Sequence, residues 1–270
     1  MPLWFAVLLG FLQGAAEFLP VSSSGHLALL QGFFPALAPE DGLFFDTVLH
    51  LGTLLALTAA YRRELWGLLK ALRTLPRPSE GGKADRRLLG LLALGTLPLA
   101  LVLPLKGWIG KLSGDPGAVG AALLMNGCLL YISDKLISGR KNALSAGAGD
   151  ALLVGFTQAL AAIPGISRSG STVTAGLLAG FDRPFAVSYS FLLSFPAVLG
   201  ACLVKLAEAL RAGPEPGMLL PCLAGAAAAA LAGFPAICLV RALVRKGKFR
   251  PFAFYCWALG LGVVTISVIT

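Results

Sequence analysis

Arg168 is the residue whose chemistry fits its surroundings least, because it interrupts a long apolar stretch of the sequence. It lies in the hydroxyl-rich run Ser167-Arg168-Ser169-Gly170-Ser171-Thr172, directly before another apolar segment. A charge near the centre of a bilayer is costly, so it normally has a partner or a ligand. A guanidinium, neighbouring hydroxyls and the amides of a helix N-terminus all favour a phosphate. The run therefore predicts a phosphate-binding site, and a structural ion pair between Arg168 and Glu17 is the alternative.

A second polar run carries a carboxylate, three hydroxyls and an imidazole: Glu17, Ser22, Ser23, Ser24 and His26. A histidine can serve as nucleophile or general acid/base near neutral pH. A carboxylate can orient that histidine, activate a hydroxyl or hold a divalent cation. Taken alone, the serines could form an N-cap and His26 could be a buried structural residue. Opposite a phosphate site, we expect these residues to take part in catalysis or substrate binding.

Four further polar residues stand near the two runs. Asp46 and His50 are four residues apart and share one face of a helix, so they either line the same cavity or form a polar patch at the outer interface. Gln13 and Gln158 each stand one turn before a polar run, where we expect them to face the cavity and to hydrogen-bond to the broken backbone. Neither H-x-x-x-H nor C-x-x-C occurs, so the spacing indicates no transition-metal site.

The amino-acid composition indicates what kind of helices or strands must position these residues. Of the 270 residues, 57% are hydrophobic and only 13% are charged, whereas charged residues make up about 25% of a typical soluble protein. These proportions exclude a soluble enzyme and a disordered chain. The net charge of +9 would suggest nucleic acid in a soluble protein, but the basic residues lie in short loops between apolar segments. We therefore expect a membrane-embedded helical bundle and no nucleic-acid partner.

Six segments are long and apolar enough to span a bilayer, which takes about 20 residues. They are residues 43–61, 86–105, 118–138, 184–207, 217–240 and 251–270. Two more apolar regions, 3–34 and 151–180, are interrupted at the two polar runs and look like pairs of half-length helices. Backbone that leaves the helix at membrane depth must be buried in protein or line a wet cavity. The expected fold is an all-α integral membrane protein of about ten helices, with six transmembrane helices and two re-entrant pairs.

The two interrupted regions resemble each other when the chain is shifted by 145 residues. Seven of the sixteen positions from Gly10 to Gly25 are then identical to their counterparts, among them Ser22 with Ser167 and Ser24 with Ser169. The match indicates an internal duplication, with a first half of residues 1–148 and a second half of residues 149–270, together forming a single membrane domain.

The basic residues predict the orientation. Of the 22 Lys and Arg residues, 17 lie in the segments 61–87, 135–141 and 241–250 or at Arg183, and four lie in the alternate loops. This bias places the first set in the cytoplasm and both termini outside. The two broken pairs then enter from opposite faces, as in an inverted-topology repeat whose halves meet near the bilayer midplane. Residues 62–73 alternate charges with Leu and Trp, which predicts an amphipathic helix at the cytoplasmic interface.

Three segments resemble the undecaprenyl-diphosphatase family, also called the bacitracin-resistance family. They are Gln13-Gly14-Ala15-Ala16-Glu17-Phe18-Leu19-Pro20-Val21-Ser22-Ser23-Ser24-Gly25-His26, Phe45-Asp46-Thr47-Val48-Leu49-His50-Leu51-Gly52-Thr53 and Pro164-Gly165-Ile166-Ser167-Arg168-Ser169-Gly170-Ser171-Thr172. The resemblance covers the whole chain. It implies a multi-pass phosphatase of the bacterial plasma (inner) membrane, which converts undecaprenyl diphosphate to the monophosphate carrier for peptidoglycan synthesis and so contributes to bacitracin resistance.

The resemblance also implies roles for the site residues. The catalytic set is Glu17, Ser23, His26 and Arg168. The nucleophile is Ser23, His26 or a water that His26 activates. Substrate binding falls to Ser22, Ser24, Ser167, Ser169, Gly170 and Thr172. Activity in the family is associated with Mg2+ or Ca2+, for which Glu17 is the acidic ligand here. Some members carry a second Glu where this chain has Gln13, which weakens a two-carboxylate metal site.

A transporter or flippase of polyprenyl phosphate lipids is the alternative function, because inverted repeats with broken helices are typical of secondary transporters. Such a protein would use Arg168 in the same way without needing His26 as a catalyst. The two functions could also be combined in one protein. The sequence leaves open the oligomeric state, including a homo-oligomer, and the membrane face to which the cavity opens.

Overall fold

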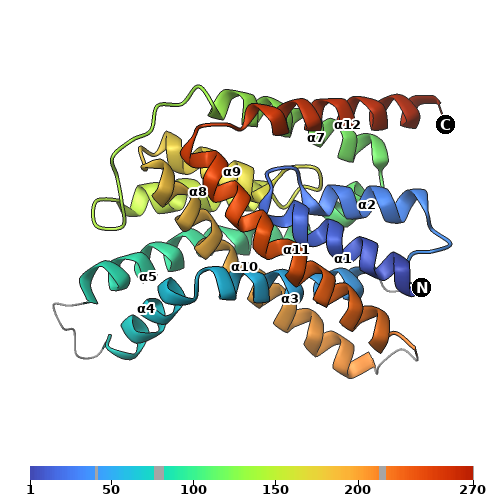
Figure 1. Ribbon diagram of the computed structural model, residues 1–270, viewed down its shortest axis with the longest axis horizontal. Coiled ribbons are helices and arrows are strands. Elements are labelled where there is room, and N and C mark those ends of the chain that lie inside the picture. Colours follow the sequence, from blue (N-terminus) through green and yellow to red (C-terminus); the bar gives the residue numbers. More distant parts are fainter. Residues whose placement is uncertain (40–41, 76–81, 213–216, 270) are drawn as a thin grey trace.

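The computed structural model describes residues 1–39, 42–75, 82–212 and 217–269. Within these ranges the regular secondary structure is helical apart from one isolated bridge between Lys141 and Phe181 (Figure 1). The helices are α1 (Leu3–Phe18), α2 (Ser23–Phe33), α3 (Gly42–Ala60), α4 (Arg62–Arg73), α5 (Lys83–Thr96), the 3-10 helix η2 (Leu97–Leu105), α6 (Lys106–Ser113), α7 (Pro116–Ser133), α8 (Ala148–Leu160), α9 (Arg168–Leu178), α10 (Arg183–Ala212), α11 (Leu219–Arg245) and α12 (Arg250–Ile269). The all-α prediction is confirmed.

Each of the six predicted spans has a counterpart in the structure. Five helical segments, at residues 83–113, 116–133, 183–208, 219–244 and 250–269, are long and apolar enough to cross a membrane, and the bent pair α3 and α4 passes the same test when taken together. The predicted span at 86–105 consists of α5 and η2, because Pro98 and Pro104 lack the amide donors that a regular α-helix requires. The helix α6 that follows η2 was not predicted.

The predicted amphipathic helix forms as α4 and turns away from α3 by 88°. Its exposed residues include both apolar and basic side chains, namely Trp66, Leu69 and Leu72 with Arg62, Arg63, Lys70 and Arg73. Residues 76–81 of the basic segment that follows lie outside the described residues. The amphipathic helix is thus confirmed, and its location at the cytoplasmic interface stays a prediction.

The two interrupted regions form the two expected pairs of short helices, α1 with α2 and α8 with α9. The chain leaves the helix before Pro20 in the first pair and around Pro164 in the second. Gly165 adopts a φ of +98°, and a Cβ there would lie 2.6 Å from the carbonyl oxygen of Val119, so only glycine fits this turn. Ser22 is the one non-glycine residue with positive φ, at 71°, among the described residues.

Each broken pair packs closely against a helix from the other half of the chain. Gly10 of α1 meets the backbone of Gly225 in α11, and Gly155 of α8 meets the backbone of Gly95 in α5. A Cβ at either Gly10 or Gly155 would overlap the facing carbonyl oxygen. Gly10 and Gly155 correspond under the 145-residue shift. Small residues that allow backbones to approach are typical of helix contacts inside membranes.

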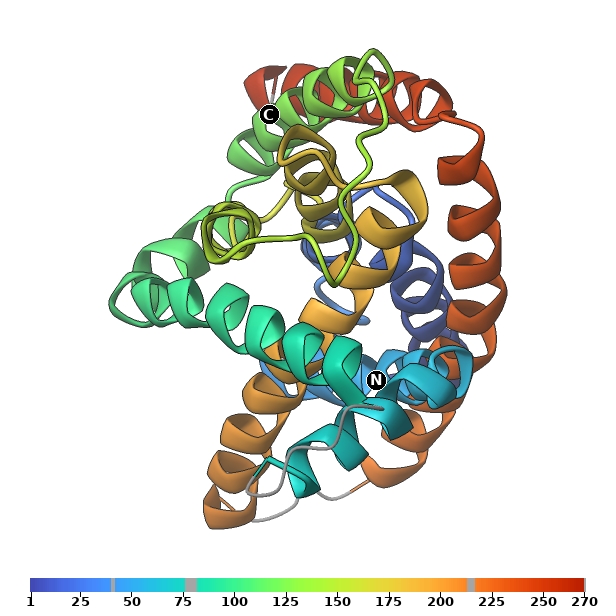
Figure 2. The same cartoon turned by 90° about the vertical axis from the view of Figure 1, so that its left-hand side faces the viewer.

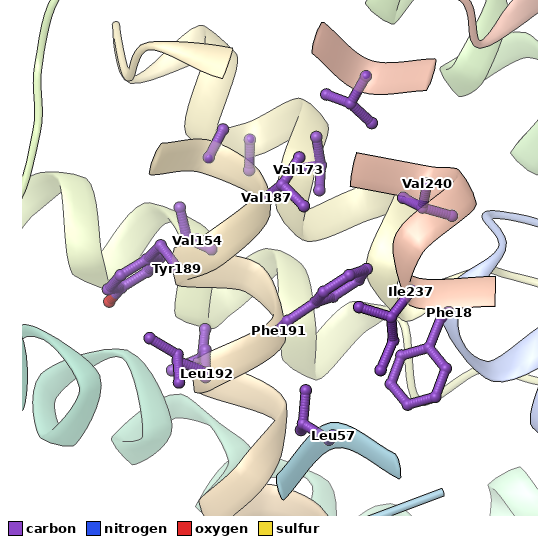
Figure 3. Packing of buried hydrophobic residues seen from close by; sticks show 14 of the residues in the cluster. Phe18, Leu57, Val154, Val173, Val187, Tyr189, Phe191, Leu192, Ile237 and Val240 are labelled. Atoms are coloured by element: carbon purple, nitrogen blue, oxygen red, sulfur yellow. The ribbon is translucent and has the colours of Figure 1, made fainter. Parts of the chain in front are cut away.

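The buried core that supports the first break lies around α10. The helices α7 and α12 run together along one side of the molecule in both views (Figures 1 and 2). Phe191 of α10 points toward Phe18 and Ile237 (Figure 3). The rings of Phe18 and Phe191 meet edge to face, with their centroids 5.5 Å apart. Phe18 directly follows Glu17, so this contact fixes the end of α1 that carries the acid.

Candidate functional site

Glu17, at the end of α1, is the centre of a buried polar cluster and is only 7% exposed. Its Oε2 accepts hydrogen bonds from Ser23 Oγ at 2.6 Å and from Gln13 Nε2 at 2.9 Å. Its Oε1 pairs with the guanidinium of Arg168, which begins α9. The two polar runs of the sequence therefore meet in space, although Glu17 and Arg168 are 151 residues apart. The ion pair expected as the alternative role of Arg168 is present in this ligand-free structure.

His50 adds an imidazole to the cluster, since its Nε2 lies 3.7 Å from Glu17 Oε2. Its Nδ1 lies 2.7 Å from the carbonyl oxygen of Asp46, which can only accept, so Nδ1 carries the proton and Nε2 faces Glu17. The carboxylate of Asp46 instead accepts a hydrogen bond from Gln31 Nε2 at 2.7 Å. The helix α3 thus contributes His50 to the site, while the Asp46 side chain contacts α2.

The second break has the form of an N-cap. Ser167 Oγ accepts a hydrogen bond from the amide of Gly170 at 3.1 Å and lies 3.2 Å from Ser169 Oγ. Ser167 and Ser169 are both buried. Thr172 turns toward α10, where its hydroxyl lies 2.5 Å from Ser190 Oγ. The amides at the start of α9 therefore stand beside Arg168, an arrangement that can hold an anion.

The first break is tied to the second through Ser22. Its Oγ accepts hydrogen bonds from the amide of Gly25 at 3.3 Å and from the amide of Gly165 at 3.1 Å. The positive φ of Ser22 turns the chain so that this hydroxyl reaches Gly165 while Ser23 faces Glu17. Ser24 is exposed, and its Oγ lies 3.4 Å from Ser22 Oγ.

The hydrogen bonds of His26 are made to groups outside the Glu17 cluster. Its Nδ1 donates to the carbonyl of Ser22 at 2.7 Å, which leaves Nε2 to accept from the hydroxyl of Tyr255 at 2.6 Å. The two rings are nearly parallel. Tyr255, on α12, was not among the residues expected from the sequence.

The expectation for the two glutamines is wrong. Gln13 donates to the carboxylate of Glu17 rather than to the broken backbone, and its Oε1 has no partner among the described residues. Gln158 is 2% exposed, and neither atom of its amide has a partner in the described chain. The reason is visible in the 145-residue register, which places Ala162 where the first half has Glu17. Gln158 therefore lacks the carboxylate that Gln13 binds.

Asn126 is a further polar residue that the sequence analysis missed. It lies in the middle of α7 and is 1% exposed, and its side chain contacts both breaks. The only signal in the sequence was a lone amide within an apolar span, where polar residues are rare and usually have a partner.

A pocket too narrow to hold a water molecule lies beside the acid and the guanidinium. Glu17 and Arg168 line it together with Thr53 of α3 and Ser194 of α10, and its apolar wall consists of Phe18, Leu54, Leu57 and Val198. The lining thus combines polar and charged side chains with apolar ones. Such a lining suits an amphiphile with an anionic head group.

Comparison with known proteins agrees with this geometry. The family model described as "Bacitracin resistance protein BacA" matches residues 6–262. A protein named undecaprenyl-diphosphatase from Desulforapulum autotrophicum is 40% identical over 271 residues, with 97% of each chain covered. A protein of the same name from Syntrophotalea carbinolica is 42% identical, with 94% of this chain and 95% of the relative covered. Another from Halothermothrix orenii is 38% identical, with 99% of each chain covered. The chain is a multi-pass membrane protein and belongs to the bacitracin resistance protein BacA family.

Proposed function

We propose that this protein hydrolyses undecaprenyl diphosphate to undecaprenyl phosphate and inorganic phosphate. The observation that carries the proposal is the meeting of Glu17, Ser23 and Arg168 at the two breaks, which joins an acid, a hydroxyl and a phosphate-binding cation in one buried cluster. The names of the relatives support the same substrate. The polyprenyl tail would stay in the lipid while the diphosphate enters the pocket.

In this proposal Arg168 and the first amides of α9 bind the terminal phosphate and stabilise the charge that develops on it. Ser23 is the nucleophile, since its hydroxyl already donates to Glu17 at 2.6 Å. Glu17 accepts the Ser23 proton as Oγ attacks the terminal phosphorus. The bond between that phosphorus and the bridging oxygen breaks, and undecaprenyl phosphate leaves. Water then attacks the phosphoserine, releasing inorganic phosphate and returning the proton to Ser23.

His26 is the rival nucleophile, and the geometry favours Ser23 over it. The Nε2 lone pair of His26 accepts the Tyr255 hydroxyl, and Nδ1 carries a proton that Ser22 binds. Neither nitrogen is directed at Glu17. We propose that His26 instead supports the turn at Ser22 that presents Ser23 to the acid.

A divalent cation, Mg2+ or Ca2+, is part of the proposal. No group of three or more His, Cys, Asp and Glu side chains suited to a metal occurs among the described residues. Hard cations, however, can be held by one or two protein oxygens together with substrate phosphates. The Glu17 carboxylate and the unpartnered, buried Oε1 of Gln13 fit this minimal set. When bound there, the cation would neutralise charge on the diphosphate.

The membrane placement is proposed as well: the plasma (inner) membrane of a bacterium, with both termini extracytoplasmic. The crossed packing of Gly10 on α11 and Gly155 on α5 supports two halves, 1–148 and 149–270, related as inverted repeats. All contacts of the site come from one chain, so the proposal does not require a homo-oligomer.

The test is phosphate release from undecaprenyl diphosphate by the purified protein in detergent, with Arg168→Ala as the variant. We expect turnover to fall at least 100-fold, because the guanidinium contacts the reacting phosphate. Arg63→Ala, at an exposed position on α4, is the matched control and should keep normal turnover. Chelation with EDTA should lower the activity and added Mg2+ should restore it.

Two outcomes would count against the hydrolase. Normal turnover in Arg168→Ala would remove Arg168 from the mechanism. No phosphate release from well-folded protein would favour transport of polyprenyl phosphates, which flux in sealed vesicles would then detect.

A further inference from the structure

Asn126 binds both breaks at once through the two ends of its amide. Its Nδ2 donates to the carbonyl of Pro20 at 2.9 Å, and its Oδ1 accepts from the amide of Ser167 at 3.0 Å. Pro20 belongs to the turn between Glu17 and Ser23, and Ser167 is the N-cap of α9, one residue before Arg168. A single buried side chain therefore connects the segment that bears the hydroxyl with the segment that bears the cation.

The two breaks are also joined by the hydrogen bonds of Ser22 Oγ with the Gly165 amide and of Ser169 Oγ with the Leu19 carbonyl. The acid and the cation themselves are joined by the pair of Glu17 and Arg168. That link must change during turnover, because the guanidinium is the group expected to bind the incoming phosphate. The bonds of Asn126 involve only backbone groups of the breaks, so substrate binding does not compete for them. The spacing of the two breaks can thus be kept while the ion pair is remodelled.

The helix that carries Asn126 is itself held firmly. Trp257 of α12 donates its indole N–H to the carbonyl of Leu124 at 3.2 Å. Asp134, which follows α7, accepts hydrogen bonds from the amides of Phe249 at 2.6 Å and Arg250 at 2.9 Å, which fixes the start of α12. The paired helices α7 and α12 therefore form a frame beside the site (Figures 1 and 2).

We propose that Asn126 is a positioning residue, which keeps the Ser23 hydroxyl in line with the phosphate held by Arg168. The proposal rests on the proposed function, in which Ser23 attacks that phosphate. A displacement of about 1 Å between reacting groups can cost 100-fold in rate. The expected defect is therefore in the chemical step more than in substrate affinity.

The first test compares kcat and KM for Asn126→Leu and Asn126→Asp. Leucine has a similar size and forms neither hydrogen bond, so we expect kcat to fall about 100-fold while KM changes less than threefold. Ser133→Ala is the control on the same helix, because within the described part of the chain the buried Ser133 hydroxyl bonds only to the carbonyl of Leu130 in α7. It should leave kcat within twofold of the native protein.

Asn126→Asp distinguishes hydrogen bonding from packing. A protonated aspartic acid keeps one donor for Pro20 and one acceptor for Ser167, whereas the ionised form has no donor and repels the Pro20 carbonyl. The kcat of this variant relative to the native protein should therefore rise as the pH falls, or stay near native if the acid is protonated throughout. Cys256, whose Sγ lies 3.3 Å from Asn126 Nδ2, is the titratable side chain in contact, and the neighbouring Arg168 is paired with Glu17.

Two results would overturn the proposal. One is a folded Asn126→Leu variant whose kcat is within threefold of native. The other is an Asn126→Asp variant whose kcat relative to the native protein rises with pH, because the ionised acid has no donor for the Pro20 carbonyl.

A second measurement does not depend on phosphatase activity. A Cβ at Gly170 would lie 3.1 Å from Pro20 Cβ, so a Pro20→Cys/Gly170→Cys pair is close to disulfide geometry. The yield of the linked 20–170 peptide after brief oxidation, measured by mass spectrometry, should fall at least fivefold when Asn126→Leu is added. An unchanged yield would refute the positioning role even if the native protein proved inactive in the phosphate assay.

Discussion

In α1–α2 the acid Glu17 and the hydroxyl of Ser23 face each other across the break, whereas the same places in α8–α9 hold Ala162 and Arg168. The two pairs share a short helix, a proline in the break and a serine N-cap on the second helix, but φ is 71° at Ser22 and −76° at Ser167. In the proposed reaction the base and the nucleophile lie on the first pair, and the cation that binds phosphate lies on the second. The proposed site thus requires residues from both helix pairs.

The largest effect expected from this division is at Ser23. Ser23→Ala should lower phosphate release more than 1000-fold, since the nucleophile is lost. The matched variant in the other pair is Ser171→Ala, which removes a buried hydroxyl that has no partner among the described residues. It should stay within threefold of native. The measurement is kcat in detergent. Equal losses in both variants would contradict the assignment of the nucleophile to α1–α2.

The packing of the two pairs should be equivalent even though their chemistry differs. Gly10→Ala and Gly155→Ala each push a methyl group into a facing backbone carbonyl, so each should destabilise the protein by about 1–3 kcal/mol. Thermal unfolding in detergent measures both. A loss of stability confined to one of them would show that the two crossings are not alike.

The two glutamines should respond in opposite ways. Gln158→Leu replaces a buried, unpartnered amide, so we expect the free energy of unfolding to rise by about 1–2 kcal/mol with activity unchanged. Gln13→Leu removes a hydrogen bond to a carboxylate and should lower turnover about tenfold. Destabilisation by Gln158→Leu would indicate that the amide has a ligand in the membrane.

The smallest expected effect concerns the N-terminal caps of α1 and α8, the first helices of the two pairs. Asp150 caps α8 by accepting from the Gly147 amide at 2.9 Å and from Lys141, whereas α1 begins at Pro2 without a side-chain cap. Burial raises the pKa of Asp150, but the Gly147 amide and Lys141 outweigh it, so the pKa lies below its ordinary value. Asp150→Asn should cost less than about 1 kcal/mol at neutral pH.

The pH dependence of that cost follows from the lowered pKa. The stabilisation by Asp150 is present above the pKa of the unfolded chain, about 4, and is lost as the pH falls through the lower value of the folded protein. The difference in stability between native and Asp150→Asn protein should therefore shrink below about pH 4. A difference that persists in acid would mean that the charge of Asp150 is not involved.

Much of this arrangement could be predicted from the sequence. The apolar lengths predicted the spans, and the 145-residue match together with the basic loops predicted that Glu17 and Arg168 would meet. Asn126 and Tyr255 escaped prediction because a single polar residue on an apolar helix gives no period or motif, and its partner depends on how helices rotate about their axes. The unpartnered state of Gln158 was missed for another reason: the 145-residue register shows Ala162 in place of an acid, and the prediction did not use that difference.

The contact between Gly10 and Gly225 can form only late in biosynthesis, after α11 has been synthesised. The ribosome must add about 215 residues after Gly10 before α11 exists, which at 5–20 residues per second takes about 10–40 s. Gly155, by contrast, meets Gly95, which has already been made. During that interval the first broken pair is in the membrane without its packing partner, and the nascent chain is then most open to capture by membrane proteases or insertion chaperones.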